Sequence, residues 1–538
     1  MRRWNGWGDP AVDYPIPPTG LEYLQGILGV GRPIEDAERE QILATIPPSR
    51  LSGQPGLATA ADVRLTHARG QSLPDWIALR YGRLSTTPDA VAYPESEAEV
   101  RALLDLGQRL DAHLIPYGGG TSVVGHINPL PSDHPTLTVD LSRLNRLLAV
   151  DETSRLATFE AGVRGPQIEA QLVGRGFTLG HFPQSFEYST LGGWIATRSS
   201  GQQSLYYGRI EDLFAGGHLE APSGPLDLLP FPASAAGPDL RHTVLGCEGR
   251  LGIITRATVR IRPRPSDERF SAVFFRSWPE GVEAVRQAVQ RRLPFSMLRL
   301  SDPVETDTTL RLGGRPSLVR WGRRALGALG YGDGCCLLIV GSTDRRLGAR
   351  VLGGLPAGAP IGEIWRRSRF RTPYLRNSLW SSGYALDTVE TAVPWSQVVA
   401  CARAMISSLG EAQPDEPVLA FAHLSHVYVD GASIYATFLF PRRPDPDEML
   451  DRWLRMKASV SRAILDHGGT ISHQHGVGLD HAGYLAREKG PAGIAVLTAA
   501  CRVFDPEGRM NPGKLLPLEA PPGESLGACP PELRGRQS

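Results

Sequence analysis

Several features that define whole classes of protein are scarce or missing in this chain of 538 residues. Its six cysteines form no Cys-x-x-Cys pair, which argues against a zinc site and a disulfide framework and favours a reducing, cytoplasmic location. No run of about 18 apolar residues occurs, so we expect no transmembrane segment. Neither a secretory signal nor a peroxisomal address is expected from the printed ends. The net charge of +1 provides no general field for nucleic acid.

The composition that is present is typical of a large folded protein. Hydrophobic residues make up 41% and charged residues 21%, enough for two or three domains with sizeable cores. Short strand patterns alternate with helix patterns from residue 90 onward, and the pattern changes after residue 265. We expect an α+β fold with an N-terminal extension (1–85), a first domain (86–265), a second domain (266–465) and a C-terminal segment (466–516). The Pro/Glu-rich end, 517–538, is predicted to be disordered.

A glycine loop follows a predicted strand at His113–Pro116. Its three successive glycines can take backbone angles closed to other residues, so their N–H groups can turn inward as an anion-binding nest. Thr121 and Ser122 add hydroxyl donors. The spacing matches neither the nicotinamide fingerprint nor a P-loop. A triple glycine alone is more often a plain turn, so the loop by itself leaves diphosphate binding open.

Two later stretches favour a buried polar ligand. Residues 182–201 hold six Ser or Thr beside the pair Gly192-Gly193, between apolar strand patterns. Residues 246–254 form a glycine-punctuated turn that runs into a β-branched strand. A solvated loop could have the first composition, but the density of hydroxyls suits a ligand better.

These three stretches, with the ending Asp505–Lys514, resemble the flavoprotein family typified by vanillyl-alcohol oxidase. The resemblance implies a two-subdomain PCMH-type FAD-binding domain at 86–265, an α+β substrate (cap) domain at 266–465, and a C-terminal segment that returns to the FAD site. The cofactor-binding residues that it implies are Pro116, Tyr117, Gly118, Gly119, Gly120, Thr121, Ser122, Gln184, Ser185, Phe186, Glu187, Tyr188, Ser189, Thr190, Thr197, Arg198, Ser199, Ser200, Glu248, Gly249, Arg250, Leu251, Gly252, Ile253 and Ile254.

Within this family the chain also carries the motifs Arg3–Gly8, Leu191–Gly201, Tyr207–Asp212, Pro373–Asn377, Glu390–Trp395 and Ser472–Gly478. With these motifs it most resembles the alkyldihydroxyacetonephosphate synthases, enzymes of ether lipid synthesis. This likeness implies exchange of the acyl chain of an acyl-dihydroxyacetone phosphate for a fatty alcohol without net redox change, with flavin N5 as covalent holder of the reacting carbon. It also implies noncovalent FAD, although His126 is a conceivable attachment point.

The resemblance also assigns roles to single residues. Arg376 would bind the substrate phosphate, because a guanidinium fork matches phosphate oxygens. Tyr435 would transfer a proton, and His473 and His475 would be catalytic. The synthases have three consecutive histidines where this chain has Gln474 in the middle, and glutamine cannot take a proton. If the segment is extended, both imidazoles share one face, where they either meet the flavin or serve as structural residues.

Other functions stay open from the sequence. The alternative is an FAD-linked 2-hydroxyacid dehydrogenase or oxidase, with a small hydroxyacid in place of a lipid-like substrate. Some such enzymes hold a metal, but Tyr435 and Gln474 stand here where a histidine and a glutamate would be ligands, so we expect no metal. A third class is a flavin-binding scaffold without chemistry. A homodimer and a peripheral membrane contact are left open.

Overall fold

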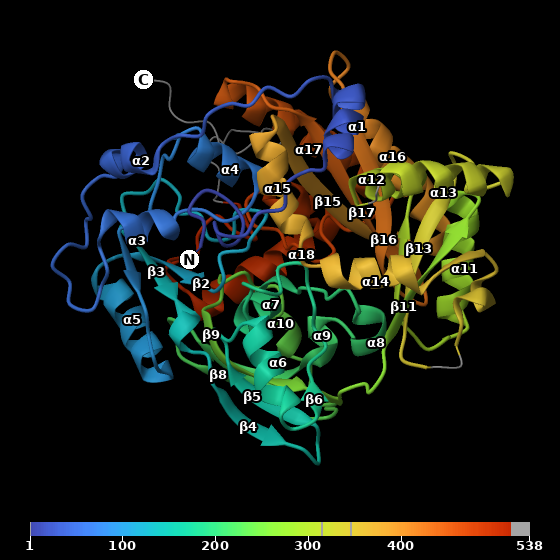
Figure 1. Cartoon of the computed structure of the whole chain (residues 1–538). Helices are drawn as coiled ribbons and strands as arrows, with labels where there is room; N and C mark the ends of the chain where they lie inside the picture. The colour runs from blue at the N-terminus through green and yellow to red at the C-terminus, as the bar shows by residue number, and fades with distance from the viewer. Residues whose placement is uncertain (1, 314–315, 345–346, 518–538) are drawn as a thin grey trace.

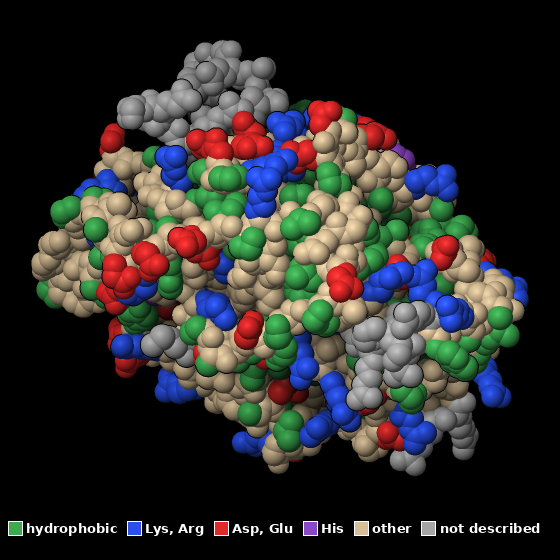
Figure 2. Space-filling model, turned by 45° about the horizontal axis from the view of Figure 1, so that its top comes forward, with side chains coloured by type: hydrophobic (Ala, Val, Ile, Leu, Met, Phe, Trp, Pro, Cys, Tyr) green, Lys and Arg blue, Asp and Glu red, His purple; other side chains and the backbone are tan. Residues whose placement is uncertain are grey.

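The computed structural model describes residues 2–313, 316–344 and 347–517, and within these ranges the strands form four sheets (Figure 1). From residue 518 onward, the predicted disordered tail lies outside the described residues. No helix in the described ranges is long and apolar enough to cross a membrane. Side chains of both charges occur among apolar ones over the face shown in Figure 2.

The first sheet is parallel and ends at the glycine loop. Its strands are, in spatial order, β1 (Ala90–Ala92), β3 (Thr136–Asp140) and β2 (His113–Tyr117). Helix α5 (Glu97–Arg109) joins β1 to β2, and the side chain of Ser96 caps its first turn. The helix lies close to the sheet because Gly107 has no side chain: a Cβ there would be 2.6 Å from Leu114.

The second sheet is antiparallel and carries the two later ligand stretches. Its strands are, in order, β4 (Leu147–Asp151), β5 (Leu156–Glu160), β9 (Ile253–Arg260), β7 (Phe214–Glu220) and β8 (Leu226–Leu228). Phe159 and Phe214 of this sheet share a buried core with Trp194 of helix α7 (Leu191–Thr197). The other short elements here are α6 (Gly165–Val173), β6 (Phe177–Thr178), α8 (Ser204–Tyr207), α9 (Ile210–Leu213), α10 (Arg241–Val244) and β10 (Arg262–Pro263).

The third large sheet has seven antiparallel strands. In order they are β14 (Leu355–Gly358), β11 (Arg269–Phe275), β13 (Cys336–Ser342), β12 (Phe295–Ser301), β16 (Leu419–Val427), β17 (Gly431–Pro441) and β15 (Tyr384–Pro394). Strand β17 is buried on both faces: Ala436 and Phe438 belong to the large core, whereas Tyr435 and Thr437 line a cavity. The alternation follows from the two-residue period of a strand.

Helices surround this sheet. Helix α16 (Val398–Glu411) packs on β16 and β17, and helix α17 (Pro446–Asp466) packs on α16. The remaining helices are α1 (Pro18–Leu28), α2 (Arg39–Thr45), α3 (Ala61–Thr66), α4 (Leu73–Arg80), α11 (Trp278–Gln290), α12 (Pro303–Gly313), α13 (Pro316–Ala328), α14 (Ala359–Ser368), α15 (Thr372–Ser381) and α18 (Ala482–Phe504).

The C-terminal segment returns to the first sheet. Met510 pairs in parallel with Leu114, so the segment adds a short bridge at the edge of β2, directly before the glycine loop. Lys514 is fully buried, and its Nζ donates to the carbonyl oxygen of Asn128 at 2.5 Å. Helix α18 runs from Ala482 to Phe504 and bends at Gly490, where φ is 68°.

Candidate active site

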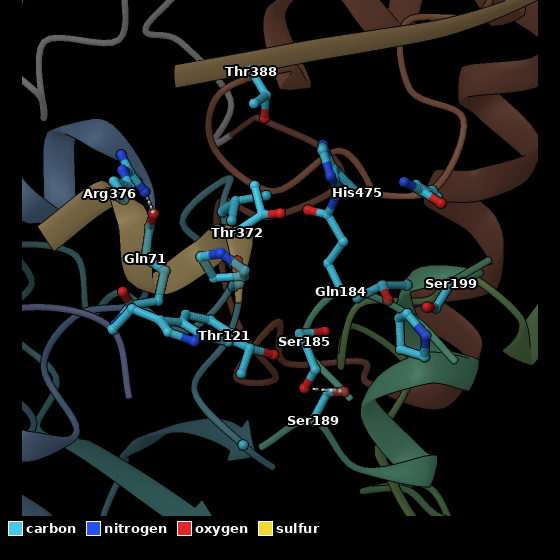
Figure 3. A pocket seen from close by; sticks show the side chains of 18 of the residues that line it. Gln71, Thr121, Gln184, Ser185, Ser189, Ser199, Thr372, Arg376, Thr388 and His475 are labelled. Atoms are coloured by element: carbon cyan, nitrogen blue, oxygen red, sulfur yellow. Dashed lines mark hydrogen bonds between the residues drawn. The ribbon is translucent and has the colours of Figure 1, made fainter. Parts of the chain in front are cut away.

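A cavity of about 670 Å³ lies between the first two sheets and the seven-stranded sheet. Its size is within the range of cofactor and small-molecule sites. In Figure 3, Thr121 and Ser189 lie on one side of this cavity, Thr388 and His475 lie on the other, and Arg376 lies at one end. The predicted glycine and hydroxyl stretches thus face side chains from the seven-stranded sheet and the C-terminal segment.

The glycine loop is held against the second ligand stretch so closely that side chains would not fit. A Cβ on Gly118 would be 2.3 Å from Thr190 Oγ1, and one on Gly119 would be 1.9 Å from the carbonyl oxygen of Tyr188. Gly120 has a φ of +59°, which favours glycine. Within the described residues, the N–H groups of Gly120 and Thr121 donate to no acceptor. This loop therefore fits a diphosphate, which binds to such free N–H groups.

The third stretch holds the C-terminal segment at the cavity. The carboxylate of Glu248 accepts hydrogen bonds from the backbone N–H groups of Val477, at 2.5 Å, and Gly478, at 2.8 Å. Its carbonyl oxygen accepts one from Asn511 Nδ2 at 2.7 Å. Glu248 thus ties both parts of the returning segment to the side of the cavity that holds the glycine loop, a contact that the sequence pattern does not reveal.

Most of the expected cofactor residues line the cavity, and the rest lie behind it. Tyr188 and Glu187 contact the hydroxyl of Tyr374, and Phe186 stacks on Phe370 at 5.2 Å. The other expected residues that do not line the cavity are Arg198, which pairs with Glu211, Arg250, which donates to the carbonyl of Met510, and the core residues Leu251 and Ile253. Those that line it are Pro116, Tyr117, Gly118, Gly119, Gly120, Thr121, Ser122, Gln184, Ser185, Ser189, Thr190, Thr197, Ser199, Ser200, Glu248, Gly249, Gly252 and Ile254.

Arg376 reaches the cavity from helix α15. Its Nη1 donates to the carbonyl oxygen of Gln71 at 2.5 Å, and its guanidinium lies 4.4 Å above the ring of Trp76. Its Nε and Nη2 are buried, and no described residue accepts a hydrogen bond from them. Burial lowers the pKa of Arg376, whereas the charges of Asp387 and Asp75 act to raise it. Donors without acceptors are costly in a buried site, so this end of the cavity suits an anion.

Tyr435 lies at the centre of the opposite wall. Its hydroxyl donates to Thr388 Oγ1 at 3.2 Å, and its ring stacks on His423 with centroids 5.0 Å apart. Burial raises the pKa of Tyr435, and the carboxylates of Glu390 and Asp387 add to this effect. The phenol therefore holds its proton firmly at neutral pH and can donate or accept hydrogen bonds in the cavity.

His423 is oriented by a buried charged pair that the sequence reasoning missed. Glu305 Oε1 lies 3.0 Å from Nδ1 of His423 and accepts a hydrogen bond from Arg299 at 2.6 Å. Although burial acts to raise it, Arg299 and His423 hold the pKa of Glu305 well below its usual range. These residues come from β12, α12 and β16, so no local motif could have indicated them.

The His473-Gln474-His475 segment is bent, so the condition for a shared imidazole face does not hold. Gln474 and His475 line the cavity. His473 lies behind it, where its Nε2 is 2.6 Å from the hydroxyl of Tyr428. The bend is held by Glu390, whose Oε1 accepts from the N–H groups of both Gln474 (2.7 Å) and His475 (2.6 Å). The glutamine therefore occupies a cavity position, which the sequence could not decide.

Neutral histidines dominate this part of the cavity. Burial lowers the pKa of His475, and Glu390 only partly opposes this. Burial also lowers the pKa of His426 to about 3, and its Nδ1 lies 2.8 Å from Ser204 Oγ and 3.1 Å from Ser200 Oγ. Among the described residues no group of three or more His, Cys, Asp or Glu is placed to hold a metal ion.

Comparisons with known proteins agree with this geometry. The family model described as FAD binding domain matches residues 88–226, and the one described as FAD linked oxidases, C-terminal domain, matches residues 264–515. The chain is 32% identical to alkyldihydroxyacetonephosphate synthase of Dictyostelium discoideum over 84% of this chain and 77% of the relative. A solved structure of an alkyldihydroxyacetonephosphate synthase superposes with a TM-score of 0.81, covering 95% of this chain and 98% of that one at 27% identity.

A more distant relative represents the alternative chemistry. D-2-hydroxyglutarate dehydrogenase of Stutzerimonas stutzeri is 24% identical over 80% of this chain and 91% of the relative. The sequence identity to the synthase, 32%, is higher than the identity to this dehydrogenase, 24%. The predicted resemblance, the α+β fold and the FAD cofactor are confirmed by these matches.

Proposed function

Since this chain belongs to the alkyldihydroxyacetonephosphate synthase family of FAD-linked proteins, we propose that it exchanges the acyl chain of an acyl-dihydroxyacetone phosphate for a fatty alcohol. The ester C–O bond breaks, a fatty acid leaves, and a new C–O bond forms to the alcohol, whose proton balances the released acid. FAD, when bound, supplies the centre at which the dihydroxyacetone-phosphate carbon is held between the two bonds.

The observation that carries this proposal is a buried cation beside an apolar wall of the same cavity. Arg376 presents two buried donors without acceptors at one end, which suits the substrate phosphate. The wall that continues beyond it is apolar and suits a long hydrocarbon chain, whereas a small hydroxyacid would leave this surface without a partner. The apolar wall consists of Leu312, Leu375, Leu379, Leu386, Phe421 and Leu439.

Tyr435 is the proton-transferring residue of this proposal. Its hydroxyl lies on the cavity wall between Thr388 and the ring of His475, whose centroid is 5.5 Å from that of the tyrosine. Because the phenol has a raised pKa, it can hold a proton at its Oη and return it. His475 keeps a neutral imidazole beside it, and His473 acts from behind the cavity through Tyr428.

We also propose that FAD is bound noncovalently. His126, the conceivable attachment point, donates to or accepts from Ser122 Oγ through Nδ1 at 2.8 Å, and its Nε2 lies 3.2 Å from Glu248 Oε1, so the ring lies between these two side chains. Cys247 also borders the cavity, but burial raises the pKa of its thiol to about 12, which disfavours the nucleophilic thiolate. A yellow pellet after acid precipitation would contradict this proposal.

The test is an exchange assay on the purified yellow protein. We expect acyl-dihydroxyacetone phosphate and a labelled fatty alcohol to give a labelled alkyl product and an equal amount of fatty acid, with no oxidant consumed. Bleaching of the flavin by a 2-hydroxyacid under anaerobic conditions would instead indicate a dehydrogenase. Absence of both reactions would favour a scaffold. The cytoplasmic location stays a prediction from the sequence, and a homodimer and a peripheral membrane contact stay open.

A further inference from the structure

The N-terminal segment Arg2–Gly8, which we call the strap, contains a motif that no part of the proposed function uses. The N-terminal end of the described chain lies near the middle of the molecule, close to β2 (Figure 1). The strap closes on itself through a hydrogen bond from Arg3 N to the carbonyl oxygen of Gly8 at 2.8 Å. It contacts both the glycine loop and helix α15.

Arg2 holds the glycine loop from outside the cavity. Its Nη1 donates to the carbonyl oxygen of Gly119 at 2.5 Å and to the hydroxyl of Tyr117 at 2.9 Å. Its Nη2 donates to the carbonyl oxygen of Gly120 at 2.6 Å. One guanidinium thus binds two successive carbonyls, which is the fork geometry that arginine provides and lysine does not.

This contact fixes the direction of the N–H groups that face the cavity. In a trans peptide the C=O and the following N–H point in opposite directions. The carbonyls of Gly119 and Gly120 point to Arg2, so the N–H groups of Gly120 and Thr121, which belong to the same two peptide planes, point away from it. These are the N–H groups that have no acceptor among the described residues.

The other end of the strap is fixed to helix α15. The side chain of Asn377 accepts from Trp7 N at 3.2 Å and donates to the carbonyl oxygen of Trp7 at 2.9 Å. Trp7 is buried, lines the cavity and packs edge-on against Tyr188, with ring centroids 5.7 Å apart. Asn377 directly follows Arg376 in the helix. The strap therefore connects the loop that faces FAD with the helix that carries the anion-binding arginine.

We propose that the strap is a clasp for FAD, in which Arg2 is a positioning residue that orients the glycine loop toward the diphosphate. Asn377 supports Arg2 by anchoring Trp7. The inference rests on FAD binding and not on the substrate proposed above, so a failed exchange assay leaves it unaffected.

The test dilutes the purified holoenzyme and measures the released FAD by its fluorescence. We expect Arg2→Ala to raise the dissociation constant for FAD by about tenfold or more, the effect of losing hydrogen bonds from a charged donor. Arg2→Lys keeps the charge but loses the fork, so it should remain nearer to Arg2→Ala than to the wild type. Arg32→Ala removes an exposed arginine of the same region and should release FAD like the wild type.

A double-mutant cycle tests the link to helix α15. Asn377→Ala should weaken FAD binding about threefold or more in the wild type but less than about twofold in the Arg2→Ala background, because both changes act through the strap. Thermal midpoints and circular dichroism of each variant separate this effect from loss of the fold. Retention of FAD by Arg2→Ala at the wild-type level, or equal retention by Arg2→Lys and wild type, would overturn the proposal.

Discussion

The two sides of the cavity are built in different ways. On the side that we propose for FAD, the surface is largely backbone: Gly118 and Gly119 lie so close to the second stretch that a Cβ would be 2.3 Å and 1.9 Å from its atoms. On the side that we propose for the substrate, the surface consists of side chains such as Tyr435, Thr388 and His423, which extend from three strands of one sheet. Changes on the first side should therefore abolish cofactor binding, whereas changes on the second side should alter the rate of a protein that keeps its FAD.

The largest effect is expected on the backbone side. Gly119→Ala places a methyl group 1.9 Å from a backbone oxygen of Tyr188, which cannot move without displacing the second stretch. We expect the purified variant to be folded but colourless, measured by the ratio of visible flavin absorbance to protein absorbance. Gly174→Ala, with open space around the added methyl, is the matched control and should stay yellow. A yellow Gly119→Ala protein would contradict the expected difference between the two sides of the cavity.

The next largest effect is expected at Tyr435. Tyr435→Phe removes the hydroxyl but keeps the packing on His423, so FAD content should be unchanged while kcat falls by about 10² to 10⁴. Because burial raises the pKa of Tyr435, its ionised fraction rises about tenfold per pH unit throughout the neutral range. If the phenolate is the base, kcat of the wild type rises with pH to at least about pH 9 and the variant loses this dependence. If Tyr435→Phe kept the wild-type kcat, the role of Tyr435 would be limited to the packing of its ring on His423.

A change at Arg376 should act mainly on substrate binding. Arg376→Met keeps much of the contact with Trp76 but removes the charge, so we expect KM for acyl-dihydroxyacetone phosphate to rise about tenfold to a hundredfold at unchanged FAD content. The exposed Arg367→Met, in the neighbouring helix α14, is the control and should keep the wild-type KM. An unchanged KM in Arg376→Met would place the phosphate elsewhere.

The smallest effect is expected at Gln474. Its side chain lines the cavity, and its Oε1 has no hydrogen-bond donor among the described residues. Gln474→His restores a group that can exchange a proton, and we expect kcat to rise, but by less than about tenfold, because neutral His475 already stands beside it. A fall in kcat would show that the amide itself serves the reaction. FAD absorbance is the check that the cofactor side is unaffected.

The sequence predicts one side of the cavity better than the other, and the reason is physical. Loops made of glycine and hydroxyl residues depend on local backbone geometry, so Pro116–Ser122 could be recognised as a candidate anion-binding loop from its composition. The pair Arg299 and Glu305 and the carboxylate of Glu390 act only through contacts across strands and helices far apart in the chain. The extended geometry considered for His473 and His475 does not occur, because Glu390 binds two successive N–H groups and bends the segment.

The sequence by itself determined the α+β fold, because glycine turns and two-residue periodicity act locally on the backbone. It marked Pro116–Ser122 as a candidate diphosphate loop, a role that the family resemblance implies. It also determined the family through motifs spread along the chain. Only the tertiary structure decided which of Gln474 and His473 faces the cavity, that Arg376 keeps two donors without acceptors, and that Arg2 reaches the glycine loop from 117 residues away. Such contacts depend on how separate elements pack, and no local pattern encodes them.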